Sequence, residues 1–359
     1  MKTLHLDTRP DWRGGQNQIL LLMRGLRTRG HGAELIALEG SPLAQRAASE
    51  NFPVHTFPKL FGRAGAARRL KKLLAENFDV VHAHDPHALT AAWLAGAHRQ
   101  TALVVARRVV YGLHAVGLAR YRAARRILAV SRFVAESVTA SGIPPEQVEV
   151  VYDGVELPAA ASPEQRRQAR ARWGSREGEI LLGCVGYLVP GKGQEHLLRA
   201  MPAVRERYPN CRLLLAGDGP LRPQLEGLAG ELGLSSCVVF ARFLADPGEV
   251  YRGLDCFVFP AVGEALGTSL LSAMAHSLPA IAVASGGVPE VIEDGVNGLL
   301  IPTPEAGAIA RCVFGLLGDR VLAARLGAAA RETIAARFTA DRMVEQTVRN
   351  YEACLQPAR

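Results

Sequence analysis

The feature of this sequence that most constrains its fold is a regular alternation of short apolar runs with segments of helical periodicity. Such alternation is typical of parallel sheets whose strands are joined by crossover helices. The runs that we assign to strands are residues 3–7, 33–38, 80–83, 103–106, 126–130, 180–186, 212–216, 238–240, 256–260 and 280–284. The sequence therefore predicts an α/β protein built on parallel sheets.

The chain of 359 residues is too long for one ordinary hydrophobic core and suits two α/β domains. The periodicity lapses between residues 152 and 173, where a Pro- and Ala-rich stretch precedes a charged helix. We predict a first domain over residues 1–157, a second over residues 158–340, and a final helix in residues 341–359 that packs back toward the first domain. Two such domains imply a cleft.

Charge is distributed unevenly along the chain. Residues 1–150 contain 21 Lys and Arg against 11 Asp and Glu, whereas the remainder contains 21 against 23. Residues 86–135 contain eight arginines and no carboxylate. A surface of this kind attracts anions. The stretch lacks the regularly placed aromatic residues of a base-stacking surface, so we expect no nucleic-acid partner.

The sequence contains no apolar run of about 20 residues, the length that a membrane span needs. Asp7 lies where a signal peptide would have its apolar stretch, so we expect a cytoplasmic protein. The six cysteines all lie in the second half without any C-x-x-C pair. We expect them to be reduced core residues rather than zinc ligands or disulfides.

A glycine pair, Gly14-Gly15, opens a helix directly after the first expected strand. Backbone amides at a helix start can bind phosphate, although a glycine pair alone is also typical of a tight turn. The pair does not belong to a G-x-G-x-x-G motif. Its absence disfavours a nicotinamide-dependent oxidoreductase, which is the rival enzyme class with two α/β domains.

Three later strand-to-helix turns carry residues that suit a phosphate or sugar ligand. One turn places Lys192 among glycines, between Gly186 and Gly193. A cation and free amides at a helix start would stabilise the charge on a departing diphosphate. Another turn contains Gly217, and a third carries Glu264 just before a helix. Taken singly, these features are also typical of a solvated lysine, a sharp turn and an N-cap carboxylate.

The order and spacing of these segments resemble family 4 of the retaining glycosyltransferases over nearly the whole chain. The motifs that carry the resemblance are Gly14-Gly15, His82-Ala83-His84-Asp85, Ala129-Val130-Ser131, Gly186-x5-Lys192-Gly193, Gly217-Asp218-Gly219-Pro220, and the segments 264–271 and 285–292. The resemblance implies a GT-B fold, in which two Rossmann-like domains have parallel sheets facing across a cleft. It also implies that a sugar is transferred from a nucleotide donor held by the second domain.

The resemblance further implies roles for individual residues. Lys192 would contact the donor diphosphate and Glu264 would bind hydroxyl groups of the transferred sugar, so both are candidate catalytic residues. His84 and Asp85 would face the acceptor from the first domain. The remaining candidate donor-binding residues are Gly14, Gly15, Gly186, Gly217, Ala265, Leu266, Gly267, Thr268 and Ser272.

Three places depart from the family pattern. Tyr187 replaces a usual arginine, which leaves Lys192 as the evident cation there. Ser272 replaces a glutamate that holds the nucleotide ribose, and losing that charged acceptor would weaken ribose binding by about 1–3 kcal/mol. Arg107 and Arg108 stand where relatives often have a histidine. We predict that they bind an anionic acceptor, the alternative being a basic surface strip.

The family resemblance suggests a retaining front-face transfer, in which the departing phosphate oxygen takes the acceptor proton. A double displacement would need two carboxylates roughly 5 Å apart, and only Glu264 lies in a suitable segment. No D-x-D motif lies in these segments. We therefore expect no metal cofactor, with Lys192 and backbone amides in the place of a divalent ion. The non-enzymatic alternative is a nucleotide-sugar- or glycan-binding protein with a decayed site.

We expect a UDP- or GDP-sugar as the hexosyl or heptosyl donor. The expected acceptor is a glycan or lipid-linked saccharide, such as a lipopolysaccharide core in cell-envelope assembly. A basic helix whose apolar positions are residues 70, 73 and 74 carries Arg68, Arg69, Lys71 and Lys72. This pattern predicts peripheral contact with anionic lipid on the inner face of the cytoplasmic membrane, with a solvated helix face as the alternative.

Overall fold

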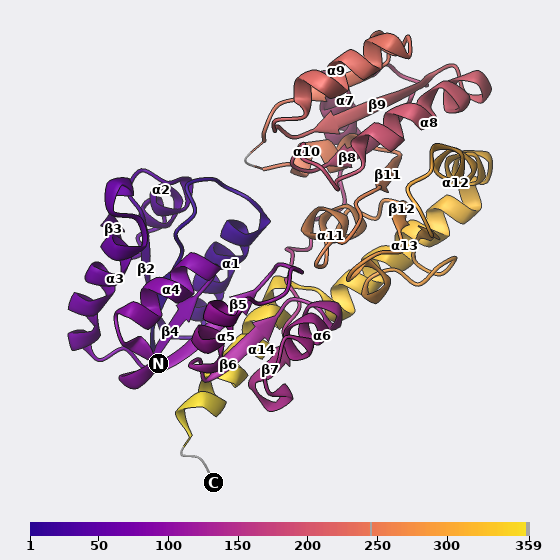
Figure 1. Ribbon diagram of the computed structural model, residues 1–359. Coiled ribbons are helices and arrows are strands. Elements are labelled where there is room, and N and C mark those ends of the chain that lie inside the picture. The colour runs from indigo at the N-terminus through magenta and orange to yellow at the C-terminus, as the bar shows by residue number, and fades with distance from the viewer. Residues whose placement is uncertain (245, 357–359) are drawn as a thin grey trace. The chain divides into compact units, whose positions relative to one another are not determined.

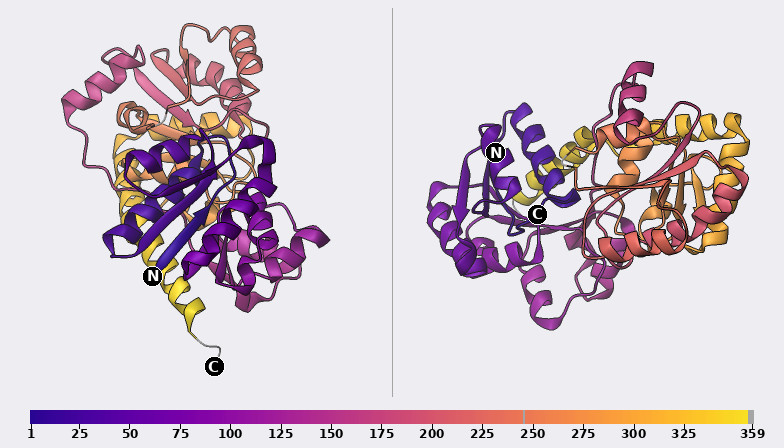
Figure 2. Two further views of the ribbon diagram at one scale, coloured as in Figure 1. Left: turned by 90° about the vertical axis from the view of Figure 1, so that its left-hand side faces the viewer. Right: turned by 90° about the horizontal axis from the view of Figure 1, so that it is seen from above.

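The computed structural model describes residues 1–244 and 246–356 and divides them into two compact units. The first unit comprises Met1–Gly154 and the chain from Ala340 onward, and the second comprises Val155–Thr339. Each unit has its own parallel sheet, with helices on both sides of it (Figures 1 and 2). The prediction of two Rossmann-like α/β domains is confirmed. The last three residues of the predicted segment 341–359 lie outside the described residues.

The first unit contains a seven-stranded sheet in the order β3-β2-β1-β4-β5-β6-β7, and all neighbouring strands in it are parallel. Its strands are β1 (Lys2–Leu6), β2 (Gly32–Leu38), β3 (Val54–Phe57), β4 (Val80–Ala83), β5 (Ala102–Arg107), β6 (Arg126–Ala129) and β7 (Val148–Val150). Its helices are α1 (Gly14–Thr28), α2 (Pro42–Ser49), α3 (Gly62–Leu73), α4 (Pro86–Leu94), α5 (Ala115–Arg122), α6 (Arg132–Ala140) and α14 (Ala340–Leu355), with 3-10 turns η1 (Lys59–Phe61), η2 (Leu74–Glu76), η3 (Ala97–Arg99) and η4 (Pro145–Gln147).

Helix α14 completes the core of the first unit although it lies at the far end of the sequence. It packs against α1, where the absence of a side chain at Gly25 admits Val344. Met343, Val344 and Tyr351 are buried in the same hydrophobic cluster as the apolar face of α1. Figure 2 shows the yellow C-terminal helix beside the indigo first helix. The first core therefore depends on both ends of the chain.

The second unit contains a six-stranded sheet in the order β10-β9-β8-β11-β12-β13, again with parallel neighbours. Its strands are β8 (Ile180–Val185), β9 (Cys211–Ala216), β10 (Val238–Ala241), β11 (Cys256–Phe259), β12 (Ala280–Val283) and β13 (Leu299–Ile301). Its helices are α7 (Pro163–Arg172), α8 (Gln194–Arg207), α9 (Arg222–Glu231), α10 (Gly248–Gly253), α11 (Thr268–Ala275), α12 (Ala306–Gly318) and α13 (Arg320–Arg337), with the 3-10 turn η5 (Val288–Glu290).

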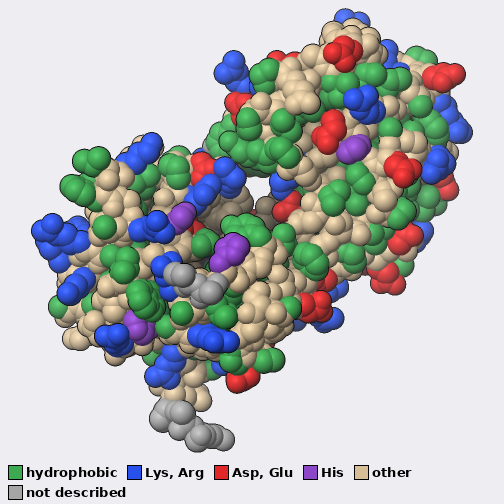
Figure 3. Space-filling view, in the orientation of Figure 1, with side chains coloured by type: hydrophobic (Ala, Val, Ile, Leu, Met, Phe, Trp, Pro, Cys, Tyr) green, Lys and Arg blue, Asp and Glu red, His purple; other side chains and the backbone are tan. Residues whose placement is uncertain are grey.

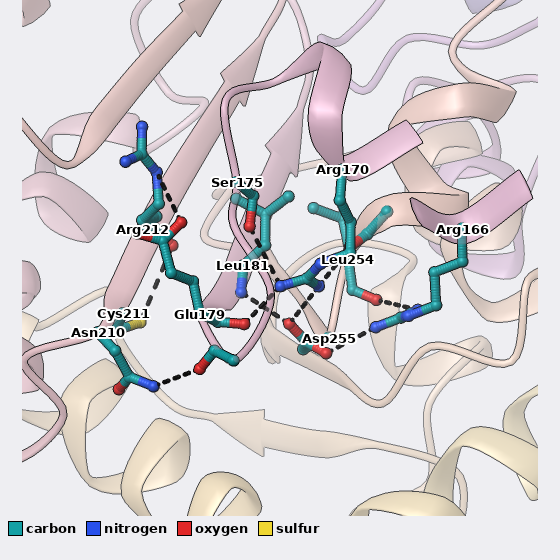
Figure 4. A network of polar contacts seen from close by, with 12 residues as sticks. Arg166, Arg170, Ser175, Glu179, Leu181, Asn210, Cys211, Arg212, Leu254 and Asp255 are labelled. Atoms are coloured by element: carbon teal, nitrogen blue, oxygen red, sulfur yellow. Dashed lines mark hydrogen bonds and ion pairs between the residues drawn. The ribbon is translucent and has the colours of Figure 1, made fainter. Parts of the chain in front are cut away.

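An arginine clamp fastens α7 to the sheet of the second unit (Figure 4). Arg166 and Arg170 donate to the two carboxylate oxygens of Asp255, at 2.6 and 2.9 Å. Asp255 also accepts a hydrogen bond of 2.7 Å from the backbone amide of Leu181 in β8. Because Asp255 directly precedes β11, the clamp fixes the two central strands and the helix that leads into the unit.

Each apolar run assigned to a strand forms one in the structure. The strands that the sequence pattern did not reveal are β3, β7 and β13, which lie at sheet edges. Most of their residues are only half-buried, whereas those of β4, β11 and β12 are fully buried. An edge strand needs no continuous apolar run, and this is why these three were missed.

All six cysteines are free, and five of them are buried. Throughout residues 1–244 and 246–356, every helix is too short or too polar to cross a bilayer.

Candidate functional site

In each sheet, the direction in which successive strands are added reverses next to the strand that comes first in the sequence. In the first unit the reversal lies between β1 and β4, and in the second between β8 and β11. Loops that leave the carboxyl ends of two such strands diverge to opposite faces of the sheet, and ligands of open α/β folds bind in the opening between them. The residues predicted from the sequence follow these four strands.

Lys192 and Glu264 meet at the reversal point of the second sheet. Lys192 lies in the turn after β8 and Glu264 in the turn after β11. The Lys192 Nζ donates to the carboxylate of Glu264. Their side chains are about 30% and 20% exposed, so the ion pair is open to solvent on one side. A cation and an anion are thus available together at the place where this fold class binds ligands.

The loops around this ion pair are in direct backbone contact. Gly217 directly follows β9 and has a φ of 148°. A Cβ at this position would lie 2.0 Å from the carbonyl oxygen of Gly186, which follows β8. The Gly286 backbone has φ of 62°, and a Cβ there would lie 2.0 Å from the carbonyl oxygen of Glu264. The amide of Gly287 donates to the same oxygen at 2.9 Å. Side chains at positions 217 and 286 would push these loops apart, and glycine at 286 lets its loop pack directly on the backbone of Glu264.

The segment after Glu264 offers backbone rather than side chains to a ligand. Ala265 and Leu266 are buried, Gly267 is the N-cap residue of α11, and Thr268 is its first residue. The first amides of a helix have no partner within the helix and carry partial positive charge, which suits them to bind an anion. These predicted donor-binding residues therefore place the free amides of a helix start a few residues after Glu264 in the chain.

Ser272 lies one helical turn further along α11. Its hydroxyl donates to the carbonyl oxygen of Thr268 at 3.0 Å. The hydroxyl proton is thus used within α11, and only the oxygen is left to accept a hydrogen bond from a ribose. The predicted contact of Ser272 with the nucleotide therefore has weak geometric support.

Tyr187, the other departure in this unit, is 37% exposed at the end of β8. Its backbone carbonyl accepts a hydrogen bond from Gln194 at the start of α8. The aromatic ring thus lies at the carboxyl edge of the sheet, in place of the arginine of the family pattern.

At the reversal point of the first sheet, Asp85 is the N-cap of α4. Its carboxylate accepts from the backbone amides of His87 and Ala88 at 2.8 and 2.9 Å. It also accepts from the Thr8 amide and hydroxyl at 2.7 and 2.9 Å. Asp85 is 7% exposed. These four bonds join the loop after β1 to the loop after β4, so Asp85 holds this edge together.

His84 belongs to a buried cluster of three histidines with His5 and His82. His5 and His82 are register partners on β1 and β4, and His84 follows two residues later on the same face. The Thr3 hydroxyl donates to the carbonyl of Gly32 and therefore accepts from His5 Nε2 at 3.1 Å. His5 Nδ1 then accepts from His84 Nε2 at 3.0 Å, which fixes the tautomers of both rings.

Burial keeps all three rings neutral. It lowers the pKa of His5 to about 3 and those of His82 and His84 well below the ordinary histidine value, with the Arg108 charge adding to the effect on the last two. His82 Nδ1 pairs with the Tyr351 hydroxyl at 2.6 Å, which links the strand to α14. Within the described residues, His82 Nε2 and His84 Nδ1 have no hydrogen-bond partner.

One ring nitrogen from each of the three histidines lies within 4.8 Å of the other two. Two imidazoles bound at about 2 Å to one tetrahedral ion have ring centroids about 5 Å apart. The rings of His82 and His84 are packed with centroids only 4.0 Å apart. This close, tilted ring contact fits a hydrogen-bonded polar cluster better than a metal centre.

Asp7 was not recognised from the sequence as part of this edge. It follows β1 and is 1% exposed, and it accepts hydrogen bonds of 3.1 Å from Gln16 Nε2 and from the Arg9 amide. Burial and, to a smaller extent, the nearby charge of Asp85 raise the pKa of Asp7 to about 7, against the lowering effect of those hydrogen bonds. An acid directly after an apolar strand, with another acid after the neighbouring strand, was the available signal.

The predicted acceptor-binding arginines have partners inside the first unit. Arg107 is 2% exposed, and its guanidinium donates to the Tyr121 hydroxyl at 3.0 Å and to the Tyr111 carbonyl. Arg108 Nε donates to the buried Asp153 at 2.8 Å. Their proposed role as anion ligands stays a prediction, and the geometry gives Arg107 in particular a structural role.

Arg108 also lies beside the glycine pair. A Cβ at Gly15 would lie 3.9 Å from Arg108 Cδ, and Gly14 and Gly15 are the first residues of α1. The Arg108 Nη1 is buried without a partner within residues 1–244 and 246–356. The first unit therefore brings a guanidinium and the amides of a helix start together.

Comparisons with known proteins give one family. Residues 12–158 match the model described as glycosyltransferase family 4, and residues 165–333 match the model described as glycosyl transferases group 1. A GDP-mannose-dependent alpha-(1-6)-phosphatidylinositol monomannoside mannosyltransferase of Mycolicibacterium smegmatis is 30% identical over 357 residues, which cover 90% of each chain. An uncharacterized glycosyltransferase of Methanocaldococcus jannaschii is 30% identical over 237 residues, 64% of this chain and 60% of that protein.

A solved structure has the same fold over nearly the whole chain. Anabaena HepE in complex with UDP and glucose superposes with a TM-score of 0.88 at 21% identity, covering 98% of this chain and 100% of HepE. At that identity the likeness supports the fold alone. Fold, relatives and family models agree, and the chain belongs to the group 1, family 4 glycosyltransferases of the GT-B fold.

Proposed function

We propose that this protein transfers a hexosyl or heptosyl group from a nucleotide sugar to a saccharide acceptor, with retention of configuration and without a metal cofactor. The observation that carries the proposal is the Lys192–Glu264 ion pair at the reversal point of the second sheet, framed by the amides of the α11 start. The pair supplies one group for a diphosphate and one for sugar hydroxyls.

In this proposal, binding of the donor separates the ion pair. Lys192 and the free amides of Gly267 and Thr268 bind the diphosphate, while the Glu264 carboxylate accepts hydrogen bonds from hydroxyls of the transferred sugar. Positive charge that is already in place stabilises the leaving diphosphate more as its charge grows. The departing phosphate oxygen then takes the proton of the acceptor hydroxyl, so the reaction needs neither a second carboxylate nor a divalent ion.

The donor is proposed to be a UDP- or GDP-sugar. A GDP-mannose-dependent relative and a UDP-bound solved structure support these two nucleotides. Gly186 and Gly217 line the edge on which the nucleotide would lie, and Gly14 and Gly15 would add phosphate contacts from the first unit. Since Ser272 has replaced the ribose-binding glutamate, we expect weaker affinity for the nucleotide than a family member with that glutamate has.

The acceptor is proposed to be a glycan or a lipid-linked saccharide of the cell envelope, such as a lipopolysaccharide core. The basic first unit and a relative that acts on a phosphatidylinositol monomannoside support an acceptor attached to lipid. His84, Asp85, Arg107 and Arg108 mark the unit on which it would bind. The protein would then work in the cytoplasm, in peripheral contact with the inner face of the membrane.

One observation favours a second candidate function, which is nucleotide-sugar binding without turnover. The Ser272 hydroxyl already donates to the Thr268 carbonyl, and Tyr187 has no positive charge. A transfer assay separates the two functions. Purified protein is incubated with UDP- and GDP-sugars and a lipid-linked saccharide, with and without EDTA, and the anomeric configuration of the product is read by NMR.

Product with the donor's configuration, formed equally with EDTA, is the expected result. Inverted product contradicts the retaining mechanism, and loss of activity with EDTA contradicts metal independence. Tight binding of a nucleotide sugar without product for any acceptor or water would favour the binding protein.

A further inference from the structure

An exposed apolar pair lies on the basic side of the first unit. Leu60 and Phe61, in η1, are 87% and 60% exposed. Lys59 precedes them and Arg63 follows, and both side chains are exposed. Isolated apolar residues are normal on a protein surface, but two adjacent large ones that are this exposed are not. The pair forms an apolar tip with a positive charge on each side.

Helix α3 continues this surface with charge alone. Its apolar residues Leu70 and Leu73 are buried with Ala66 and Ala67, so the apolar face expected to touch lipid instead packs on the sheet. Its outer face carries the exposed side chains of Arg68, Lys71 and Lys72. The exposed apolar groups are therefore at the start of the helix rather than along it.

The tip lies at the start of the charged helix. Residues 64, 68 and 72 follow one another at spacings of four, so they lie along one side of α3. Phe61 precedes the helix and packs on its first turn, since a Cβ at Gly65 would lie 2.9 Å from Phe61 Cβ. Between residues 51 and 75 the sequence contains no Asp or Glu. In the space-filling view, Lys and Arg side chains gather along the edge of the first unit that β3 and α3 form (Figure 3).

We propose that this surface, defined by Lys59, Leu60, Phe61, Arg63, Arg68 and Lys72 and called here the β3–α3 surface, docks onto an anionic lipid bilayer. Basic side chains approach the phosphate headgroups, and the Leu60–Phe61 tip enters the boundary between headgroups and acyl chains. Two apolar side chains are far too little for a stable protein partner, which needs about 800 Å² on each side. They suffice for insertion into a bilayer when charge supplies the rest.

The β3–α3 surface lies near the candidate acceptor residues of the first unit. Strand β3 is parallel to β1, so η1 leaves the same carboxyl edge from which Gly14-Gly15 and His84-Asp85 follow. β3 and β1 are two strand spacings apart, which is about 10 Å. Docking therefore places the lipid surface beside the edge that carries the candidate acceptor residues. This last step rests on the proposed function, since it makes the acceptor a saccharide whose lipid stays in the bilayer.

The test is co-sedimentation of the full chain with vesicles of phosphatidylcholine, alone or mixed equally with phosphatidylglycerol. Wild type is expected to bind the anionic vesicles and to be released by high salt. The double variant Leu60→Ser, Phe61→Ser is expected to bind at least about tenfold more weakly. The charge-reversal variant Arg68→Glu, Lys72→Glu is expected to lose at least about tenfold as well.

Two matched controls lie in the second unit. Val321 is 80% exposed, so Val321→Ser removes an exposed apolar side chain elsewhere, and Arg320→Glu reverses an exposed charge next to it. Both control variants are expected to bind vesicles as wild type does. Equal losses in controls and test variants, or no binding of wild type to anionic vesicles, would overturn the proposal.

A second measurement tests insertion of the tip directly, without relying on a loss of binding that misfolding could also cause. In Phe61→Trp, indole fluorescence is expected to shift to the blue and to become quenched by lipid-borne bromine when anionic vesicles are added. A tip that stays in water gives neither change and overturns the proposal. Donor-induced thermal stabilisation without vesicles is expected to be the same in Leu60→Ser, Phe61→Ser as in wild type, so failure of vesicle binding and failure of donor binding are told apart.

Discussion

The carboxyl edges of the two sheets are built from the same topology but offer different chemistry. At the second, Lys192 and Glu264 form a solvent-accessible ion pair among glycine turns and free helix amides. At the first, His84 and Asp85 are buried and engaged with other parts of the unit. The second edge presents charged groups to a ligand, whereas the first has its polar groups committed to holding two loops together. We infer that the second edge carries the chemistry.

The largest effect is expected from breaking the ion pair. Lys192→Ala and Glu264→Gln should each lower transfer by about 10²–10³-fold, because each removes a group that acts on the developing charge or on the sugar. Steady-state rates with the preferred donor provide the measurement. The controls Arg320→Ala and Glu231→Gln change exposed residues outside these edges and outside the β3–α3 surface, and should keep wild-type rates. If the ion-pair variants remain fully active, the assignment of the second edge is wrong.

The next effect concerns the first edge and its dependence on pH. Asp7 has a folded pKa of about 7, above the ordinary aspartate value. Between pH 4 and 7 the unfolded chain releases this proton while the folded chain keeps it, so the Asp7 contribution to stability falls as pH rises. The expected loss is about 2–4 kcal/mol. Asp7→Asn should remove it, as measured by urea unfolding at pH 5 and pH 8.

The buried histidines act in the opposite sense. Their folded pKa values are lowered, so their contribution to stability falls as pH drops below the ordinary histidine value near 6.5. The informative quantity is therefore the difference between wild type and Asp7→Asn at each pH, in which the histidines cancel. A difference that does not change between pH 5 and pH 8 would contradict a raised Asp7 pKa.

A smaller effect is expected from the clamp that frames the second edge. Asp255→Asn loses the charge that pairs with Arg166 and Arg170, and should lower the free energy of unfolding of the second unit by about 2 kcal/mol. Trp173, in the second unit, can report it by fluorescence during urea unfolding. The exposed Arg167–Glu164 pair provides the control, since Glu164→Gln should leave the free energy of unfolding nearly unchanged. Equal losses would contradict a special role for Asp255.

The smallest effect would sharpen the description of the second edge. Ser272→Glu restores the acidic residue of the family pattern, and should strengthen binding of a nucleoside diphosphate by up to about tenfold. Calorimetric titration measures it, with Ser236→Glu, at an exposed position outside the proposed site, as a control. Unchanged affinity in a variant that melts as wild type does would mean that another group already holds the ribose.

The sequence predicted much of the fold because buried parallel strands leave a continuous apolar signal. Strand β4 was predicted to the residue, whereas β3 and β13 were missed because an edge strand is partly exposed. The motif order also located the turns that carry Lys192 and Glu264. Their contact could not be derived from local pattern, since it joins turns that are 72 residues apart.

The first edge was harder to predict because its polar residues are buried through long-range contacts. Tyr351 reaches His82 from a helix that is 269 residues away in the sequence. Arg107 and Arg108 were expected to form an anion site, but burial and pairing depend on Tyr121 and Asp153, which local sequence does not place beside them. A run of basic residues in a sequence predicts an anion-binding surface only if their side chains are exposed in the fold.

The central claim is that the second unit holds a nucleotide sugar at Lys192 and Glu264. Thermal melting of wild type, Glu264→Ala and the control Glu231→Ala against UDP, GDP and their sugars tests it most directly, because a ligand of the native state raises the melting temperature. The account predicts that one nucleotide sugar stabilises wild type and the control, and that Glu264→Ala loses more stabilisation by the sugar than by its parent diphosphate. Equal stabilisation of all three proteins by that sugar, or none by any ligand, would contradict it.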